Sequence, residues 1–384
     1  MLNFSYYNPV RILFGHGSIA QLKDVIPIDS KVMVIYGGGS IKRNGVYEQV
    51  MTALNRHQVS IFGGIEPNPR YETCIKAVEK ARQERAEFLL GVGGGSVLDA
   101  SKFIAAAVPY QGMDPWDMVI GKTSVNGALP LGCVLTLPAT GSEMNINAVI
   151  SRDSTRQKVP FKSEHLFPRF SILDPTTSFS LPMRQLANGI VDSFVHVCEQ
   201  YLTFDVNAPL QNRQAEALLL TLIEQAALLQ KAPECYEVRA NLMWCATQAL
   251  NYNLACGVPS DWSTHAIGHE LTALFDLDHA RALAVVLPAL LKHQSKQKSE
   301  MLMRYGRQVW GLSGLSSEAT IDQAIEKTAV FFQSLQVPTR LSDYAIDRQA
   351  CEEIINRFEK RPTKVGEHQD IGAKEVAAIL RLAE

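Results

Sequence analysis

The first half of the chain alternates short apolar runs with longer amphipathic stretches. The apolar runs have the length and composition of buried strands and lie at residues 31–36, 59–62 and 88–91. Apolar residues at helical spacing lie between and after these runs, over residues 46–57, 71–83 and 97–107. This order of strand, tight loop, helix and strand is typical of a doubly wound, largely parallel α/β sheet.

Beyond Leu181 and Pro182 the pattern changes to long helical stretches punctuated by Pro and Gly. Helical spacing is clearest over residues 185–201, 210–229, 236–254 and 322–335. The sequence therefore predicts an α/β domain over residues 1–182 and an all-helical domain over residues 183–384. A chain of 384 residues is too long for one ordinary core, which agrees with a division into two domains.

Composition narrows the class of protein. A hydrophobic content of 46%, a charged content of 20% and a net charge of −2 describe a soluble globular protein, and the dispersed cations argue against a nucleic-acid partner. No apolar run approaches the roughly twenty residues of a membrane span, and no secretion signal is recognisable. The seven cysteines lack CxxC spacing, so we expect reduced thiols and a cytoplasmic location.

Two glycine-rich loops each follow a predicted strand directly, Gly37-Gly-Gly-Ser40 and Gly93-Gly-Gly-Ser96. Each could be a simple tight turn, but glycines also let backbone N–H groups approach phosphate oxygens at a helix N-terminus. Two such loops at the ends of strands predict nucleotide binding. A third string, residues 15–20, matches G-x-G-x-x-A but is not assigned, because no strand–helix–strand unit with a suitably placed acid follows it.

The helical half carries a cluster of potential metal ligands: Asp192, His196, His265, His269 and His279. The pairs at 192/196 and 265/269 are four residues apart, so a helix places both members on one face. One carboxylate with several neutral imidazoles suits Fe²⁺ or Zn²⁺. From spacing alone, the two histidines of the second pair could both be ligands, or one could carry protons behind the metal.

These residues lie in motifs that resemble the iron-containing (group III) alcohol dehydrogenases, and within them the branch of NADPH-dependent aldehyde reductases. The resemblance extends over essentially the whole chain. Its most specific motifs lie at residues 93–102, 137–143, 188–196 and 261–269. It implies a dehydroquinate-synthase-like architecture with the active site in a cleft between the two domains, in a protein that forms a homodimer or larger homo-oligomer.

The resemblance also implies roles for individual residues. The metal ligands would be Asp192, His196, His265 and His279, and His269 would relay protons near the nicotinamide. Asp99, with Lys102, would shape the cofactor cleft and take part in catalysis. The expected cofactor contacts are Gly37, Gly38, Gly39, Ser40, Lys42, Gly94, Gly95, Ser96, Asp99, Thr136, Pro138, Thr140, Ser142 and Lys158.

The expected activity is reversible reduction of small or medium aldehydes to alcohols, with the metal as Lewis acid and the nicotinamide as hydride donor. Candidate substrate contacts are Asn145, Asn147, Trp262 and Cys256. The alternatives are a glycerol-dehydrogenase-like polyol oxidiser, a dehydroquinate-synthase-like lyase, and a non-catalytic nucleotide- or metal-binding protein. The residues around 264–269 and the first glycine loop argue against the two alternative enzymes.

The first glycine loop also predicts which nicotinamide cofactor is used. NAD enzymes place a carboxylate near the adenosine ribose, where it repels a 2′-phosphate. The loop at residues 37–40 contains no acid and is followed by Lys42 and Arg43, which favours NADP(H). We therefore expect a much higher kcat/KM with NADPH than with NADH in an aldehyde-reduction assay. Equal efficiency with both cofactors would contradict this prediction.

Overall fold

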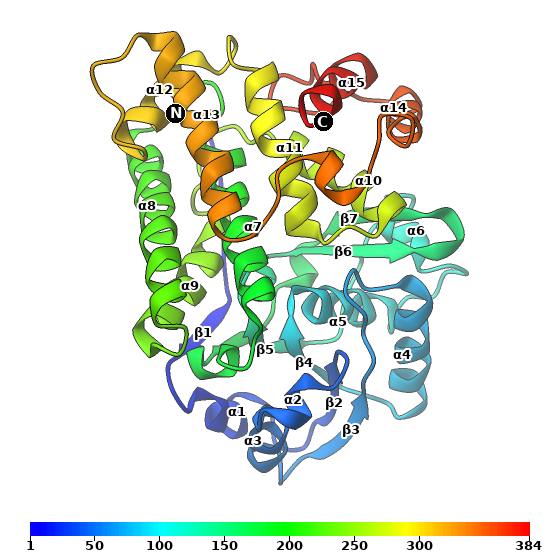
Figure 1. Ribbon diagram of the computed structural model, residues 1–384. Coiled ribbons are helices and arrows are strands. Elements are labelled where there is room, and N and C mark those ends of the chain that lie inside the picture. The colour runs from blue at the N-terminus through cyan, green and yellow to red at the C-terminus, as the bar shows by residue number, and fades with distance from the viewer. The chain divides into compact units, whose positions relative to one another are not determined.

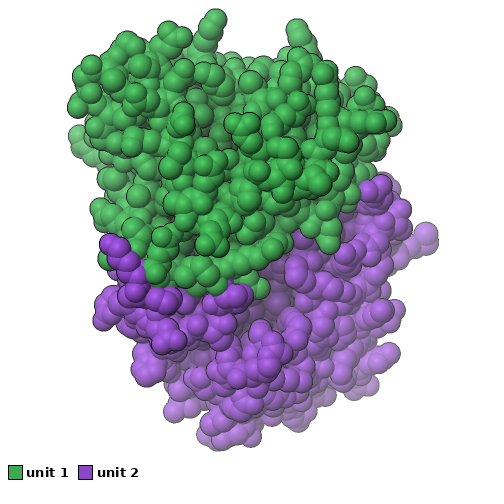
Figure 2. Space-filling view, in the orientation of Figure 1, with its two compact units in different colours: residues 1–6, 183–230, 248–384 green, residues 7–182, 231–247 purple.

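The computed structural model describes residues 1–384, which form two compact units (Figures 1 and 2). The first contains residues 7–182 and 231–247, and the second contains residues 1–6, 183–230 and 248–384. We refer to them as the α/β unit and the helical unit. Most of helix α9 (Tyr236–Ala249) groups with the α/β unit, where its Met243 packs against Leu135 and Leu173.

The α/β unit is built on a six-stranded sheet whose strand order is β1-β8-β5-β4-β2-β3. All its pairings are parallel. The strands are β1 (Arg11–Phe14), β2 (Lys31–Tyr36), β3 (Gln58–Phe62), β4 (Phe88–Gly94), β5 (Leu131–Leu137) and β8 (Phe170–Leu173). From β2 the chain moves outward to β3 and then returns to β4 on the other side of β2. The strand order therefore reverses between β2 and β4, and such a switch point is where ligands bind in open α/β sheets.

Each strand contributes side chains to both faces of this sheet. In β2, Met33 and Ile35 belong to the core under α4 (Tyr71–Gln83) and α5 (Gly95–Ala107). The alternate residues of β2 belong to the opposite core, together with residues of α3 (Val46–Ala53). Burial on both faces explains why the strands are nearly continuous apolar runs in the sequence. The predicted doubly wound α/β class is therefore confirmed.

The α/β unit also contains an antiparallel ribbon that the sequence analysis did not predict. It pairs β6 (Asn147–Arg152) with β7 (Gln157–Lys162). Polar residues occur in both strands and Pro160 interrupts β7, so their sequence lacks a strong strand pattern. The shorter elements of this unit are η1 (Ser18–Gln21), α1 (Leu22–Val25), α2 (Ser40–Arg43), α6 (Trp116–Val119), η2 (Ser142–Met144), η3 (Asp153–Thr155), η4 (Glu164–Leu166) and η5 (Pro175–Ser178).

The helical unit is centred on α11 (His279–His293), which packs against α7, α10, α13 and α15 (Figure 1). Because neighbours surround it, almost every residue from Ala280 to Leu291 is buried. The other helices are α7 (Met183–Tyr201), α8 (Pro209–Lys231), α10 (Ser263–Phe275), α12 (Ser299–Gln308), α13 (Ser317–Ser334), α14 (Glu352–Glu359) and α15 (Ala373–Leu382), with the 3₁₀ turn η6 (Leu341–Tyr344). None of the helices combines the length and apolarity that a membrane span requires.

Candidate metal centre and nucleotide loops

The predicted metal ligands converge inside the helical unit. Asp192 and His196 lie one turn apart on α7, His265 lies on α10, and His279 begins α11. Ligand atoms of Asp192, His265 and His279 all lie within 4.8 Å of one another. Nε2 of His196 and Nε2 of His279 each lie 3.7 Å from Oδ1 of Asp192. Three helices thus bring together one carboxylate and three imidazoles.

Burial gives this cluster the chemistry of a cation site. Asp192 is 2% exposed, and its Oδ1 takes part in no hydrogen bond. A buried carboxylate oxygen without a partner is unfavourable, and a divalent cation would satisfy it. Burial also lowers the pKa of His196 to about 4, because it disfavours the charged imidazolium. His196 therefore stays neutral near pH 7, which is the form that can ligate a metal.

Glu199, which the sequence analysis missed, orients one of the imidazoles. Its carboxylate contacts Nδ1 of His265 and accepts a hydrogen bond of 2.7 Å from the backbone N–H of Thr264. Since Nδ1 of His265 is engaged, Nε2 is the nitrogen left to act as a ligand. Histidine ligands commonly have such a carboxylate behind them. Glu199 is three residues after His196 on one helix, so spacing on α7 could have indicated it.

His269 lies beside the group formed by Asp192, His265 and His279. Its ring centroid is 5.2 Å from that of His279 and 6.0 Å from that of His265. The preceding residue allows α10 to approach α11 closely, since a Cβ on Gly268 would lie 2.9 Å from a side-chain carbon of Leu283. His269 is thus near the cluster but one helical turn further along α10, and its role as a proton relay stays a prediction.

A polar contact fixes where α11 begins. Asp278, immediately before His279, accepts hydrogen bonds of 2.8 Å from Nη2 of Arg184 and 3.0 Å from Nδ2 of Asn188. Both donors lie on α7, the helix that carries Asp192. The start of α11, and with it His279, is therefore anchored to the helix that supplies the carboxylate.

In the α/β unit the two glycine segments lie at the two strands of the switch point: residues 37–40 follow β2, whereas residues 93–96, predicted as a loop, are the end of β4 and the start of α5. Tyr36 of β2 pairs with Val92 of β4, so the segments that follow these residues are neighbours. Gly39 has φ of 89°, a conformation that favours glycine. A Cβ on Gly95 would come within 2.5 Å of the Thr140 side chain. The start of α5 therefore lies directly against Thr140, another predicted cofactor contact.

Lys42 is held by aromatic rings at the edge of the first loop. Its Nζ lies 5.0 Å from the ring centroid of Tyr36 and 5.4 Å from that of Tyr47. These cation–π contacts restrict a long, exposed side chain while its ammonium group stays charged. A cation is thus fixed within two residues of Ser40, the first residue of α2.

Asp99 and Lys102 form a buried network beneath the segment that follows β5. The carboxylate of Asp99 accepts hydrogen bonds from Oγ of Ser142 at 2.7 Å and from the N–H of Val149 at 2.9 Å. Lys102 donates to Ser142, to Oδ1 of Asn145 and to the carbonyl of Asn147, at 2.7–3.1 Å. Both oxygens of Asp99 are engaged within the protein, and its assignment as a catalytic residue stays a prediction.

The remaining predicted contacts lie on several elements. Thr136 and Pro138 are at the end of β5, beside β4, and Lys158 on β7 donates to Oδ1 of Asn68 at 2.8 Å. Trp262 immediately precedes α10, with its ring centroid 5.3 Å from that of His265. Cys256 is partly buried in the helical unit. Trp262, one of the four candidate substrate contacts, thus lies beside the metal cluster.

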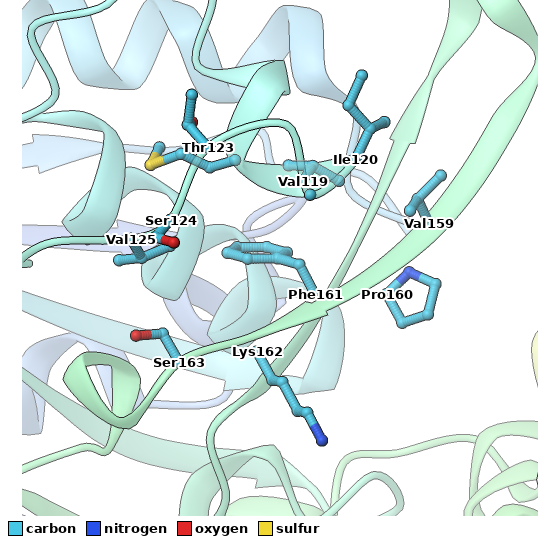
Figure 3. Close-up of a pocket in the computed structure, with 12 residues that line it drawn as sticks. Val119, Ile120, Thr123, Ser124, Val125, Val159, Pro160, Phe161, Lys162 and Ser163 are labelled. Carbon is cyan, nitrogen blue, oxygen red and sulfur yellow. The ribbon is translucent and has the colours of Figure 1, made fainter.

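The α/β unit also contains a cavity of about 580 Å³ (Figure 3). Phe161 and Val159 of β7 form one side, and residues 118–121 and 123–125 form the other. None of the predicted cofactor contacts lines this cavity, although Lys158 is adjacent in sequence to Val159. We therefore do not assign the cavity to the candidate site.

The chain matches one protein family over nearly its whole length. The match covers both the parallel sheet with its glycine segments and the helical region with its Asp/His cluster. Residues 9–175 match the family described as iron-containing alcohol dehydrogenase. Residues 186–383 match the C-terminal region of the Fe-containing alcohol dehydrogenase family. The chain belongs to the iron-containing alcohol dehydrogenases, as its motifs predicted.

Individual relatives cover nearly the full chain. NADPH-dependent aldehyde reductase YqhD of Escherichia coli (strain K12) is 51% identical over 97% of both chains, and a crystal structure of it superposes with a TM-score of 0.98, covering 100% of this chain and 99% of that one. NADP-dependent alcohol dehydrogenase 3 of Entamoeba histolytica is 42% identical over 99% of this chain and 98% of its own. The structure of NADH-dependent butanol dehydrogenase A from Thermotoga maritima is 37% identical, with a TM-score of 0.95 and coverage of 100% and 99%.

The contact between Glu199 and His265 generates a prediction. Replacing Glu199 by Gln should weaken binding of Fe²⁺ or Zn²⁺ by about tenfold or more, because the carboxylate that orients the imidazole is lost. Competition with a chromophoric chelator would measure this change. Glu216→Gln is a matched control, since Glu216 is also buried in the helical unit but pairs with Arg304. Equal metal affinity in the wild type and the Glu199→Gln variant would contradict the assigned role.

Proposed function

We propose that this protein is an NADP(H)- and metal-dependent alcohol dehydrogenase that reduces small and medium aldehydes to alcohols. The observation that carries the proposal is the buried convergence of Asp192 with three imidazoles, one of them oriented by Glu199. Two matched relatives, one named an aldehyde reductase and one an alcohol dehydrogenase, support this substrate class over a polyol.

The proposed metal ligands are Asp192, His196, His265 and His279, with Fe²⁺ or Zn²⁺ as the cation. A cation bound there would supply Lewis acidity toward a carbonyl oxygen. The single carboxylate leaves the loaded site with net positive charge, which favours the negative oxygen that develops during reduction. His269 is the proposed donor of the proton that this oxygen must then receive.

The proposed cofactor, NADP(H), supplies the hydride. The glycine loops would present backbone N–H groups to its phosphates, and Lys42 would pair with the 2′-phosphate. Matched relatives include proteins named for NADPH and one named for NADH, so the overall fold does not decide this choice. The acid-free loop and the restrained ammonium group of Lys42 are the local features that support NADP(H).

We propose further that the functional division of the chain falls at residues 182/183, and that the protein acts in the cytoplasm as a homodimer or larger homo-oligomer. All seven cysteines are free and five of them are buried, which is the expected state for a reducing compartment. The oligomeric state rests on the family resemblance alone.

Loss of one imidazole tests the metal role directly. His265→Ala should abolish both metal retention, measured by elemental analysis, and NADPH oxidation with an aldehyde panel, because one of four ligands is removed. His293→Ala is the control, since His293 ends the same helix that His279 begins. Unaffected turnover in the His265→Ala variant would remove the central claim.

The role of Lys42 is tested by cofactor selectivity. Lys42→Ala should raise the KM for NADPH several-fold and leave the KM for NADH nearly unchanged, because only NADPH carries the 2′-phosphate. Lys23→Ala, on α1, is the control for loss of one surface cation from the same unit. A parallel change in both KM values would show that Lys42 does not recognise the phosphate.

A further inference from the structure

The helical unit buries a second ionic cluster, formed by Lys298, Asp261 and Glu367. Their side chains are 1%, 4% and 3% exposed. Nζ of Lys298 lies 2.8 Å from Oδ2 of Asp261 and 2.5 Å from Oε1 of Glu367. It also donates a hydrogen bond of 2.8 Å to the carbonyl of Leu202. All three N–H bonds of the ammonium group are therefore directed at protein acceptors.

This cluster joins four separate segments of the helical unit. Lys298 immediately precedes α12, and Leu202 immediately follows α7. Asp261 lies two residues before α10, and Glu367 lies in the loop between α14 and α15. The cation thus links the end of the helix that carries Asp192 to the start of the helix that carries His265.

Stability alone is a poor explanation for such a cluster. Removing charges from water is costly, and well-packed apolar residues commonly stabilise a protein as much as a buried ion pair does. Here one cation faces two carboxylates, which adds a repulsion between like charges. The alternative role of a buried ionic group is to fix one arrangement of the chain. The contacts of Asp261 indicate that the segment fixed here is the start of α10.

Asp261 connects the cation to the first turn of α10. While Oδ2 faces Lys298, Oδ1 accepts hydrogen bonds from the backbone N–H of Ser263, at 3.0 Å, and from its hydroxyl group. The Asp261 N–H in turn donates to the carbonyl of Glu199 at 2.8 Å. Trp262 lies between Asp261 and Ser263 and adopts φ of 61°. The contacts of Asp261 therefore hold this short connection in a conformation that non-glycine residues rarely adopt.

Two carboxylates therefore fix successive backbone N–H groups at the start of α10. Asp261 accepts a hydrogen bond from the N–H of Ser263, and Glu199 accepts one from the N–H of Thr264. These groups have no partner within the helix, so side chains determine how the first turn is placed. His265 follows at once, and Glu199 also contacts its imidazole. A shift of Asp261 would change the geometry between His265 and Glu199.

We propose that Lys298 is a positioning residue for the metal centre, which acts through Asp261 to place the first turn of α10 and so His265. Glu367 serves a different purpose, as a second acceptor for the ammonium group, because the first backbone N–H groups of α10 donate to Asp261 and Glu199 instead. The inference rests on the proposed function, because it requires that His265 is a metal ligand.

The test compares two isosteric variants of the full-length protein. Asp261→Asn and Glu367→Gln each remove one carboxylate and leave Lys298 with one remaining carboxylate partner. The proposal predicts that Asp261→Asn raises the dissociation constant for Zn²⁺ by about tenfold, and that Glu367→Gln stays close to the wild-type value. Lys298→Met should resemble Asp261→Asn. Zn²⁺ affinity is measured by chelator competition, with the KM for NADPH and the melting temperature of the metal-free protein as further readouts.

A structural role without positioning would lower the melting temperatures and leave the Zn²⁺ affinity unchanged in all three variants, and this result would overturn the proposal. Equal losses of affinity in Asp261→Asn and Glu367→Gln would also overturn it. If Lys298→Met does not fold, the double variant Lys298→Met/Glu367→Gln, which leaves fewer unpaired charges, takes its place. Failure of the proposed function is distinguishable, because the wild-type protein itself would then not bind Zn²⁺.

Discussion

The helical unit depends on one electrostatic constraint, which is the burial of the Asp192 carboxylate among three imidazoles, of which His196 is kept neutral by its own burial. Oδ1 of Asp192 lies 3.7 Å from two imidazole nitrogens and takes part in no hydrogen bond. Such an arrangement is costly unless a cation completes it. Three helices have to meet at this point, and the contacts of Asp278 with α7 and of Glu199 with α10 hold them there. The packing of these three helices therefore depends on the side chains that form the candidate metal centre.

The α/β unit follows a separate constraint, set by the order of its strands. Because the strand order reverses between the parallel neighbours β2 and β4, the segments at the carboxyl ends of these strands lie next to each other at one edge of the sheet. Both segments contain glycines, and at Gly95 even a methyl group would meet Thr140. Backbone N–H groups can therefore approach a nucleotide closely at this edge. The buried network of Asp99 and Lys102 supports the neighbouring segment from inside the protein.

The strands and helices that periodicity predicted all overlap elements of the structure, because amphipathic helices and buried parallel strands have strong patterns, but β1, β5 and β8 of the main sheet were not predicted. The helix expected over residues 46–57 ends at Ala53, and β4 continues to Gly94 where a loop was expected. The β6–β7 ribbon was missed because its sequence is polar and contains Pro160. Asp192 and the histidines were identifiable since histidine is rare in this chain and these residues are spaced at helical intervals. Glu199, despite its helical spacing from His196, and Lys298 were missed, because an acid or a lysine in a helical region is ordinarily solvent-exposed. Only tertiary contacts show that these two are buried.

The central claim is that Asp192 and the three imidazoles around it hold one divalent cation that meets the substrate oxygen. Titration of metal-free protein with Co²⁺, followed by visible absorption, tests this claim most directly, since the bands report the number and geometry of the ligands. The account predicts that the bands saturate at a single equivalent of Co²⁺ and change when an aldehyde or its alcohol is added. Absence of saturable uptake, or bands that do not respond to either compound, would contradict it.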